Sequence, residues 1–333
     1  MLRNPRVWLG FAVSVACLGL LFRQIDPAEL GDALASVRYE WLLAAIAVEF
    51  LALWVRGIRW RMILHESVRI SNWDAFAVLI IGYAANNLLP LRAGELVRAQ
   101  LLYAQHGTSR LATFGTILVE RIFDVLVLAI FVAAPIAVLG GDPVLRGTAL
   151  LLLLAALGAT LVLGLLALWP GFTDLIVTML RLLPTALRPR AREALGSFLG
   201  GVRALRRPGP WLAVSAASVA TWLLEASAFW LAGIGCGLRL DPVVYLVLCG
   251  AATLVLAVPS TAGGIGLFEL STSAVAGTFG VPSAAGTAYA LVLHVLVLLL
   301  PVVLLGLALL WRRHLGVGAM IRAGQAAAEG PAT

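Results

Sequence analysis

Residues 86–95 read NNLLPLRAGE and residues 259–266 read PSTAGGIG, and each stretch ends a short apolar segment, over 75–91 and 243–258. A polar or amphipathic segment follows each break. Backbone broken by proline and glycine exists at membrane depth only where protein buries it or where it lines a wet cavity. We therefore expect two re-entrant hairpins, over 75–105 and 243–280, that break at Pro90, Gly94, Pro259, Gly263, Gly264 and Gly266.

The composition places the chain in a membrane. Of its 333 residues, 61% are hydrophobic and 12% are charged, and the mean hydropathy is +0.99. A soluble domain is about 45–50% apolar and about 25% charged, so soluble enzymes, disordered proteins and disulfide scaffolds are excluded. The expected fold is an all-α polytopic membrane protein with about six full spans besides the two hairpins. The expected spans cover residues 7–23, 41–58, 111–139, 147–169, 210–236 and 283–311.

The arginines orient these spans. All 24 basic residues are arginine, and the formal net charge is +7. If both hairpins are re-entrant, seventeen arginines lie in the cytoplasm with both termini, and four lie outside, as the positive-inside rule requires. An eight-span alternative would place Arg110 and a seven-arginine loop outside. No basic run is interleaved with aromatic residues, so no nucleic-acid partner is expected.

The two hairpins share the pattern Pro-x-x-Ala-Gly at 90–94 and 259–263, in halves of opposite orientation. This pattern indicates an inverted repeat with its site at the broken helices. The expected organisation is a first transmembrane repeat over 1–140, a linking span with a basic cytoplasmic segment over 141–209, a second repeat over 210–315, and a disordered tail over 316–333. For the segment 171–209, an amphipathic helix on the leaflet and a plain linker are equal alternatives.

Nine charged residues lie in or beside the apolar segments: Glu49, Arg92, Glu95, Arg98, Glu120, Arg121, Asp124, Glu225 and Glu269. A charge at the bilayer centre costs about 2.5–3.5 kcal/mol, so each of them should face the protein interior. Arg92 and Arg98 lie near a half-helix terminus, where two guanidiniums are suited to bind a lipid phosphate. Asn86 and Asn87 either donate to the same phosphate or cap the broken helix.

The remaining charges are expected to form an intramembrane network. Glu95 can sit between Arg92 and Arg98, while Glu120 and Asp124 share one helical face beside Arg121, and Glu269 closes the second hairpin. An alternative role for this group is simple bracing of the hairpins.

Glu49 and Glu225 lie mid-span with no adjacent partner, so we expect them to carry a proton at rest. They are candidates for proton coupling, or else they only donate hydrogen bonds. His294 is expected to be a hydrogen-bonded residue of the bundle rather than a ligand.

Three arginines against six carboxyls leave a charge of −3 at membrane depth if all are ionised. A site for a plain anion should not carry that charge. Either some carboxyls are protonated, or the ligand carries a cationic group, or a proton or sodium ion accompanies it. No catalytic residue, metal site or cofactor is expected, because no Ser-His-Asp set, no His/Cys spacing and no phosphate-cradling loop is present.

Three motifs occur in order along the chain: residues 86–95, Glu120-Arg121-Ile122-Phe123-Asp124, and residues 259–269. Together they resemble the signature of the lysylphosphatidylglycerol synthase transmembrane (flippase-like) family, and the resemblance covers about residues 1–315. Ala262 replaces the proline that is usual in the third motif. In multiple peptide resistance factors, this domain is thought to move aminoacylated phosphatidylglycerol between leaflets.

The resemblance implies a multi-pass protein of the cytoplasmic membrane of a prokaryote. These 333 residues lack the soluble aminoacyl-transferase domain of the family's synthases, so we do not expect synthesis of the lysyl lipid. The leading hypothesis is a lipid translocase for a phosphate-bearing amphiphile, with membrane lipids as its partners. The alternatives are a membrane-embedded enzyme or an accessory subunit in cell-envelope glycolipid assembly, and a homo-oligomer is left open.

Overall fold

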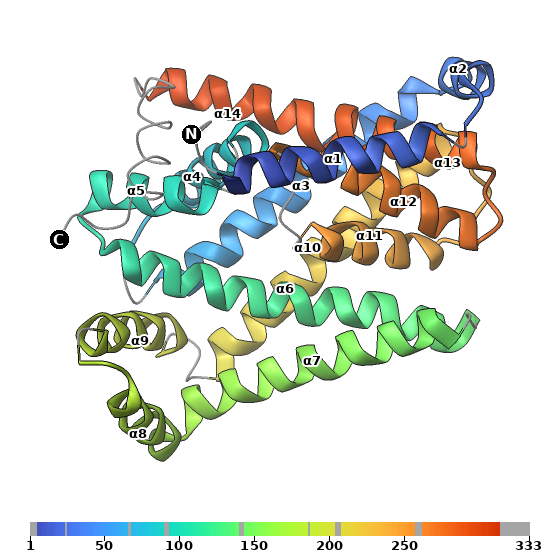
Figure 1. The fold of residues 1–333 in the computed structure, drawn as a ribbon. Helices are drawn as coiled ribbons and strands as arrows, with labels where there is room; N and C mark the ends of the chain where they lie inside the picture. Colours follow the sequence, from blue (N-terminus) through green and yellow to red (C-terminus); the bar gives the residue numbers. More distant parts are fainter. Residues whose placement is uncertain are drawn as a thin grey trace.

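The computed structural model describes residues 5–23, 25–65, 68–89, 93–139, 143–185, 187–203, 208–256 and 262–313. All regular structure in these ranges is helical, which confirms the all-α fold class (Figure 1). The helices are α1 (Pro5–Phe22), α2 (Pro27–Ala35), α3 (Tyr39–Leu64), α4 (Asn72–Leu88), α5 (Gly94–His106), α6 (Arg110–Leu139), α7 (Pro143–Leu168), α8 (Pro170–Met179), η2 (Leu180–Leu182), α9 (Arg188–Arg203), α10 (Pro208–Gly235), α11 (Val244–Val255), η3 (Ala262–Gly264), α12 (Leu267–Thr278), α13 (Ser283–Leu291), η4 (Val292–Leu299) and α14 (Leu300–Arg312).

Each of the six expected spans coincides with a long helix or, for the last, with the continuous run from α13 to α14. Four described stretches are long and apolar enough to cross a membrane: Tyr39–Leu64, Arg146–Leu166, Gly209–Gly235 and Ser283–Arg312. A fifth is obtained if the end of α1 and α2, which meet at 90°, form one broken span. The count of six spans therefore stays a prediction.

The first hairpin is built from α4 and α5, which pack against each other (Figure 1). The side chain of Asn86 accepts a hydrogen bond of 2.7 Å from the backbone N–H of Gly94 and so caps the start of α5. Gly94 lies against the backbone of Gly82, and a Cβ at position 94 would collide with the Gly82 carbonyl oxygen. Pro90 lies outside the described residues, whereas Gly94 permits the close packing of the two arms.

The second hairpin consists of α11 and α12, joined through η3. Gly263, Gly264 and Gly266 have φ of 72°, 74° and 89°, in the left-handed region that favours glycine. The Glu269 side chain accepts a hydrogen bond of 2.6 Å from the N–H of Gly266 and so fixes the start of α12. Pro259 lies outside the described residues.

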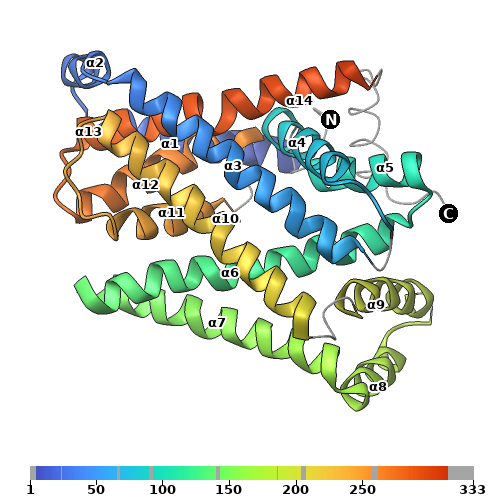
Figure 2. The same ribbon diagram turned by 180° about the vertical axis from the view of Figure 1, so that it is seen from behind.

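The two hairpins lie at opposite ends of the long helices, and both views show this arrangement (Figures 1 and 2). Their broken ends meet inside the molecule, because η3 packs against α4 and a Cβ at Gly263 would lie 3.6 Å from the carbonyl oxygen of Asn87. The last helix of each predicted half packs on the first arm of the other half's hairpin: α6 packs on α11, and α14 packs on α4. The long helices α3 and α10, one from each half, pack on each other at the centre. This reciprocity supports the inverted repeat, which stays a prediction.

The ends of the helices sort into two sides. The turn between α5 and α6, α8, α9 and the end of α14 lie at one end of the molecule, while α2 and the end of α6 lie at the other (Figures 1 and 2). The segment after α7 thus folds into helices rather than an extended linker. In α8, Phe172 and Ile176 pack into a core cluster, whereas Leu175 and Met179 are exposed. Residues 316–333, the expected tail, lie outside the described residues.

The arrangement of these ends predicts the outcome of cysteine labelling in a background without Cys17, Cys236 and Cys249. A membrane-impermeant maleimide should label Glu29→Cys and Arg239→Cys on intact cells, because both positions are exposed at the predicted outer side. Ser109→Cys, in the turn between α5 and α6, should react only after permeabilisation. Labelling of Ser109→Cys on intact cells would show that the first hairpin crosses the membrane.

The close packing of the first hairpin predicts that Gly94→Ala destabilises the protein by about 1–3 kcal/mol or more, because the added methyl group meets backbone that cannot move aside. Gly158→Ala in α7 is the matched control, since nothing lies within 4 Å of its added Cβ. The control should be neutral or stabilise by up to about 1 kcal/mol. Thermal unfolding of both variants in detergent measures the difference, and equal melting temperatures would show that the two arms can separate.

Candidate functional site

Charged side chains from three helices meet in the interior, between the first hairpin and the central helices. α3 contributes Arg59, α5 contributes Glu95 and Arg98, and α6 contributes Glu120, Arg121 and Asp124. We call these six residues the charge network. The network contains three arginines and three carboxyls, so it is formally neutral.

Glu120 is the centre of the charge network. Its side chain is fully buried, and its two oxygens face Arg98 at 2.8 Å, Arg121 at 3.0 Å and Arg59 at 3.5 Å. Three guanidiniums around one carboxylate supply both the opposite charge and the hydrogen bonds that a buried carboxylate requires. The structure brings together Glu120, Arg121 and Asp124, three of the residues predicted to form a network, and adds Arg59 to them.

Asp124 joins the charge network to α10. Its Oδ1 accepts hydrogen bonds from Arg59 at 2.6 Å and from the indole N–H of Trp222 at 2.9 Å. Arg59 also donates to the Ser218 hydroxyl at 3.0 Å, and Arg121 lies 3.5 Å from Asp124 Oδ2. Because Glu120 and Asp124 share one face of α6, a single helix face ties α3, α5 and α10 together.

Arg98, predicted to bind a lipid phosphate, is paired with groups of the protein itself in this structure. It is 1% exposed, donates to Glu120, and its guanidinium lies 4.0 Å from the ring centroid of Trp60. Its aliphatic stem runs past Gly82, where a Cβ would overlap the Arg98 side chain. Glu95 does not pair with Arg98 but lies 3.8 Å from Arg121.

The other predicted phosphate ligands lie at or near the tip. Arg92 is outside the described residues. The Asn86 side-chain oxygen caps α5, which is one of the two alternatives left open for this residue. Asn87 is half-buried, and its backbone lies beside Gly263 of the second hairpin. The phosphate-binding role of these residues stays a prediction.

Glu225 was expected to be buried away from any cation, and this is wrong. Arg56 of α3 donates a hydrogen bond of 2.5 Å to Glu225 Oε2, and both side chains are at most 10% exposed. The Arg56 guanidinium also lies 4.7 Å from the ring centroid of Trp222 and 5.7 Å from that of Tyr83. Arg56 and Glu225 are 169 residues apart, as Pro90 and Pro259 are.

Arg56 and Arg59 are two of the seventeen arginines expected in the cytoplasm, because the expected span ends at residue 58. Instead, α3 continues to Leu64, and both arginines are buried in the bundle. Helical spacing could have shown that the two arginines are buried. Glu49, Arg56 and Arg59 lie on the face of α3 that also buries Ala52 and Leu53.

Counting these two arginines corrects the charge deficit of −3. Arg92 lies outside the described residues, and Glu269 faces His294 instead, so both are left out of the new count. Among the other described residues, Arg56 and the three arginines of the charge network face five carboxyls: those of Glu49, Glu225 and the charge network. The excess is one carboxyl. Glu49 accounts for it, because its side chain is buried and its Oε2 has no hydrogen-bond partner in the described part of the chain. Its role in proton coupling stays a prediction.

Glu269 and His294 form a separate pair at the second hairpin. His294 Nδ1 lies 2.7 Å from Glu269 Oε1, and the imidazole stacks on Phe268 with centroids 4.2 Å apart. His294 belongs to η4, a π-helical segment of the last span, and is 5% exposed. It is thus a hydrogen-bonded residue of the bundle, as expected, and it holds the carboxylate that caps α12.

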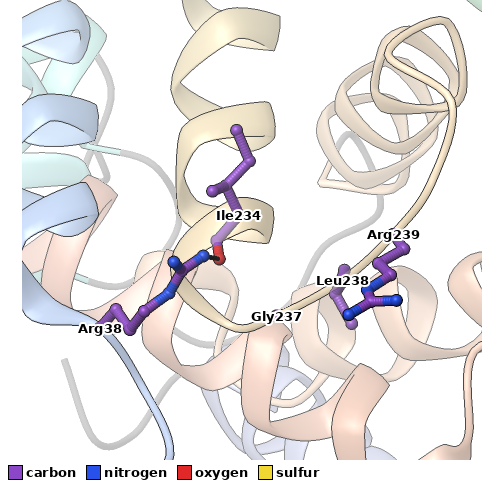
Figure 3. Close-up of a pocket in the computed structure, with 5 residues that line it drawn as sticks. All are labelled: Arg38, Ile234, Gly237, Leu238 and Arg239. Carbon is purple, nitrogen blue, oxygen red and sulfur yellow. Dashed lines mark hydrogen bonds between the residues drawn. The ribbon is translucent and has the colours of Figure 1, made fainter.

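A surface pocket lies apart from the charge network, at the end of α10 (Figure 3). It is lined by Arg38, Ile234, Gly237, Leu238 and Arg239, none of which is a predicted site residue. The Arg38 guanidinium points at the helix end and donates to the Ile234 carbonyl at 2.7 Å (Figure 3). Within the described ranges, no group of three or more His, Cys, Asp or Glu side chains could hold a metal ion.

The geometry of the charge network predicts that Glu120→Gln destabilises the protein by about 3–5 kcal/mol, since it leaves three guanidiniums around a neutral amide. Glu193→Gln, at an exposed position of α9, is the control and should stay within about 0.5 kcal/mol of wild type. Thermal unfolding in detergent at matched ionic strength compares the two. A Glu120→Gln protein as stable as the control would show that the network does not brace the fold.

Residues 7–306 match the family described as the lysylphosphatidylglycerol synthase TM region. Among similar proteins, the glycosyltransferase AglD of Haloferax volcanii is 35% identical over 133 residues, which cover 38% of this chain and 20% of that protein. A UPF0104 membrane protein of Methanothermobacter thermautotrophicus is 30% identical over 115 residues, 34% of each chain.

A second match to a UPF0104 membrane protein of the same organism is 26% identical over 297 residues, or 85% of this chain and 86% of that one. The chain thus matches between a fifth and a third of the length of the first two relatives and most of the third. No solved structure matches the chain. The match over residues 7–306 shows that the chain belongs to the family of the lysylphosphatidylglycerol synthase TM region, a family of multi-pass membrane proteins of prokaryotes.

Proposed function

We propose that the protein is a lipid translocase, of the flippase or scramblase type, that moves a phosphate-bearing amphiphile between leaflets. Such an amphiphile would be a modified phospholipid or a polyprenyl-phosphate lipid. The observation that carries the proposal is the charge network, which lies at the first hairpin, where the broken ends of both hairpins meet, and which has one exposed edge.

The physical argument starts from the cost of charge inside a bilayer. Each charged side chain costs about 2.5–3.5 kcal/mol at the bilayer centre. Six of them in one place must therefore neutralise one another or bind something polar, and a bundle of apolar helices could fold without them. Arg59, Arg98, Glu120 and Asp124 compensate one another and brace the helices. Arg121 and Glu95 are 39% and 38% exposed, so this edge of the network offers polar groups to a passing head group.

The comparisons support the same proposal. The family is named for the transmembrane region of a lipid-modifying enzyme, and its match covers nearly the whole chain. We propose the cytoplasmic membrane of a prokaryote as its location, both termini in the cytoplasm, and phosphate-bearing membrane lipids as its partners. No cofactor and no enzymatic activity are part of the proposal.

A second candidate function is that of a membrane-embedded enzyme or an accessory subunit in cell-envelope glycolipid assembly. The name of the relative AglD, a glycosyltransferase, favours it, although only 20% of that protein is matched. An embedded enzyme acting on a polyprenyl-phosphate sugar would need a carboxylate free of arginine. Glu225, a buried mid-span carboxyl, would be the candidate for this role, but it is paired with Arg56, which weakens the enzyme alternative.

The deciding experiment is leaflet exchange in reconstituted vesicles. Purified protein in liposomes should speed the loss of fluorescence when dithionite quenches nitrobenzoxadiazole-labelled phosphatidylglycerol or a labelled polyprenyl phosphate. Heat-unfolded protein in the same vesicles is the control. Exchange no faster than in empty vesicles for both lipids would overturn the proposal. Mass spectrometry of the recovered lipids would detect the product of an enzyme.

If transport is coupled to protons, Glu49 is the residue expected to carry the proton, since it is the carboxyl in excess. Glu49→Gln should abolish any dependence of leaflet exchange on an imposed pH gradient while lipid binding stays within about twofold of wild type. Glu225→Gln is the comparison, because it removes the partner of Arg56 and should lower the melting temperature. Gradient dependence that persists in Glu49→Gln but disappears in a folded Glu225→Gln protein would assign the proton to Glu225.

A further inference from the structure

The arginines of the charge network differ in how accessible they are. Arg59 is fully buried and Arg98 is 1% exposed, whereas the Arg121 side chain is 39% exposed. Arg121 is nevertheless anchored, because Glu120 lies 3.0 Å and Asp124 3.5 Å from its guanidinium. Its Nε is buried and has no hydrogen-bond partner in the described part of the chain, so a ligand would reach the guanidinium through its terminal nitrogens. Arg121 is thus an anchored cation with an exposed part that a ligand can contact.

The position of Arg121 along α6 makes this exposure costly unless something polar meets it. With a rise of about 1.5 Å per residue, Arg121 lies about 16 Å along the axis from Arg110, at the start of α6. If α6 crosses the membrane as expected, that depth is near the centre of a hydrocarbon layer about 30 Å thick. A guanidinium exposed there requires water or an anionic ligand.

The neighbours of Arg121 on α6 suit an amphiphile rather than a small anion. Leu118 precedes Arg121 by one turn and is 50% exposed, and Val125 follows by one turn and is 37% exposed. The exposed face of α6 therefore presents one cation between two apolar side chains. A phosphate at Arg121 would place acyl or prenyl chains along Leu118 and Val125.

Glu95 is the one member of the charge network that a phosphate could replace. Its oxygen lies 3.8 Å from Arg121 Nε, beyond hydrogen-bond distance, and its side chain is 38% exposed. An exposed ion pair of this length contributes little to stability. Glu120 and Asp124, by contrast, are buried and also bind Arg98 or Arg59.

We propose that Arg121 contacts the phosphate of the lipid substrate and that Glu95 is the carboxylate that the phosphate displaces from it. This assignment rests on the proposed function and names the contact within it. In this assignment, the substrate binds at the exposed edge of the charge network, and Arg98 stabilises the hairpin instead of binding the phosphate. Glu95 then competes with the substrate for the same guanidinium.

Direct binding tests the assignment. The probe is dihexanoyl phosphatidylglycerol, with dihexanoylglycerol as its phosphate-free counterpart, and microscale thermophoresis measures the affinity of the full chain in maltoside micelles. Wild type should bind the phosphate-bearing probe more tightly than the phosphate-free one. Arg121→Ala should weaken binding of the phosphate-bearing probe at least about tenfold. Arg121→Lys should recover only part of the loss, because the bidentate fork is missing.

Glu95→Gln gives the result of opposite sign and keeps the assignment testable if Arg121→Ala fails to fold. Removing the competing charge should tighten binding of the probe about threefold or more, whereas a bracing role for Glu95 predicts weaker or unchanged binding. Arg69→Gln, at an exposed position outside the charge network, is the control and should bind as wild type. Inorganic phosphate should compete only at far higher concentrations, since it lacks the chains that Leu118 and Val125 would contact.

Wild-type affinity in Arg121→Lys together with no gain in Glu95→Gln would overturn the assignment. Equal competition by inorganic phosphate would overturn the part played by the apolar neighbours. These outcomes are distinct from failure of the proposed function, which is read from leaflet exchange by the wild-type protein. A protein that exchanges lipid but binds the probe equally in all variants is a translocase whose phosphate contact lies elsewhere.

Discussion

The fold depends on one buried carboxylate, that of Glu120, surrounded by the guanidiniums of Arg59, Arg98 and Arg121. Each of these groups alone would be too costly inside a membrane protein, and together they bring α3, α5 and α6 to fixed positions. Asp124 extends the same interaction to Trp222 of α10. The first hairpin can therefore end inside the molecule, because its returning arm is held by charge as well as by apolar packing.

The second hairpin achieves a similar position by different means. It has no arginine in its described residues, and three glycines with positive φ allow the chain to turn between α11 and α12. Glu269 caps α12 and is in turn held by His294. One hairpin is thus held by an ion network and the other by a helix cap, although both meet at the same place, where Asn87 and Gly263 lie side by side.

Much of the fold could be predicted from local sequence, because hydropathy and the Pro/Gly breaks are local properties. The long helices and the two hairpins follow from apolar runs and from residues 86–95 and 259–266. The charge network was only partly predictable. Glu120 and Asp124 are four residues apart on one helix, so their shared face can be read directly.

The partners of these carboxylates, however, lie far away in sequence. Arg59 is 65 residues from Asp124, and Arg56 is 169 residues from Glu225, so only the packing of α3 against α6 and α10 shows that they meet. Arg98 was likewise assigned to a phosphate, because the carboxylate that neutralises it, Glu120, lies 22 residues away on the next helix. A positive charge near the end of an apolar run is ambiguous in sequence, because a loop arginine and a buried one share that position.

The pair between Arg56 and Glu225 has a consequence for how such a protein could arise or be divided. If the halves are related by a two-fold axis, these two residues occupy corresponding positions and meet close to that axis. A symmetric dimer of the first half would then oppose two arginines, and a dimer of the second would oppose two glutamates. Like charges held that close repel strongly in a low-dielectric interior. With that symmetry, each half would be incompatible with its own copy at this interface and compatible with the other, so the two halves would be obligate and non-interchangeable partners within one chain.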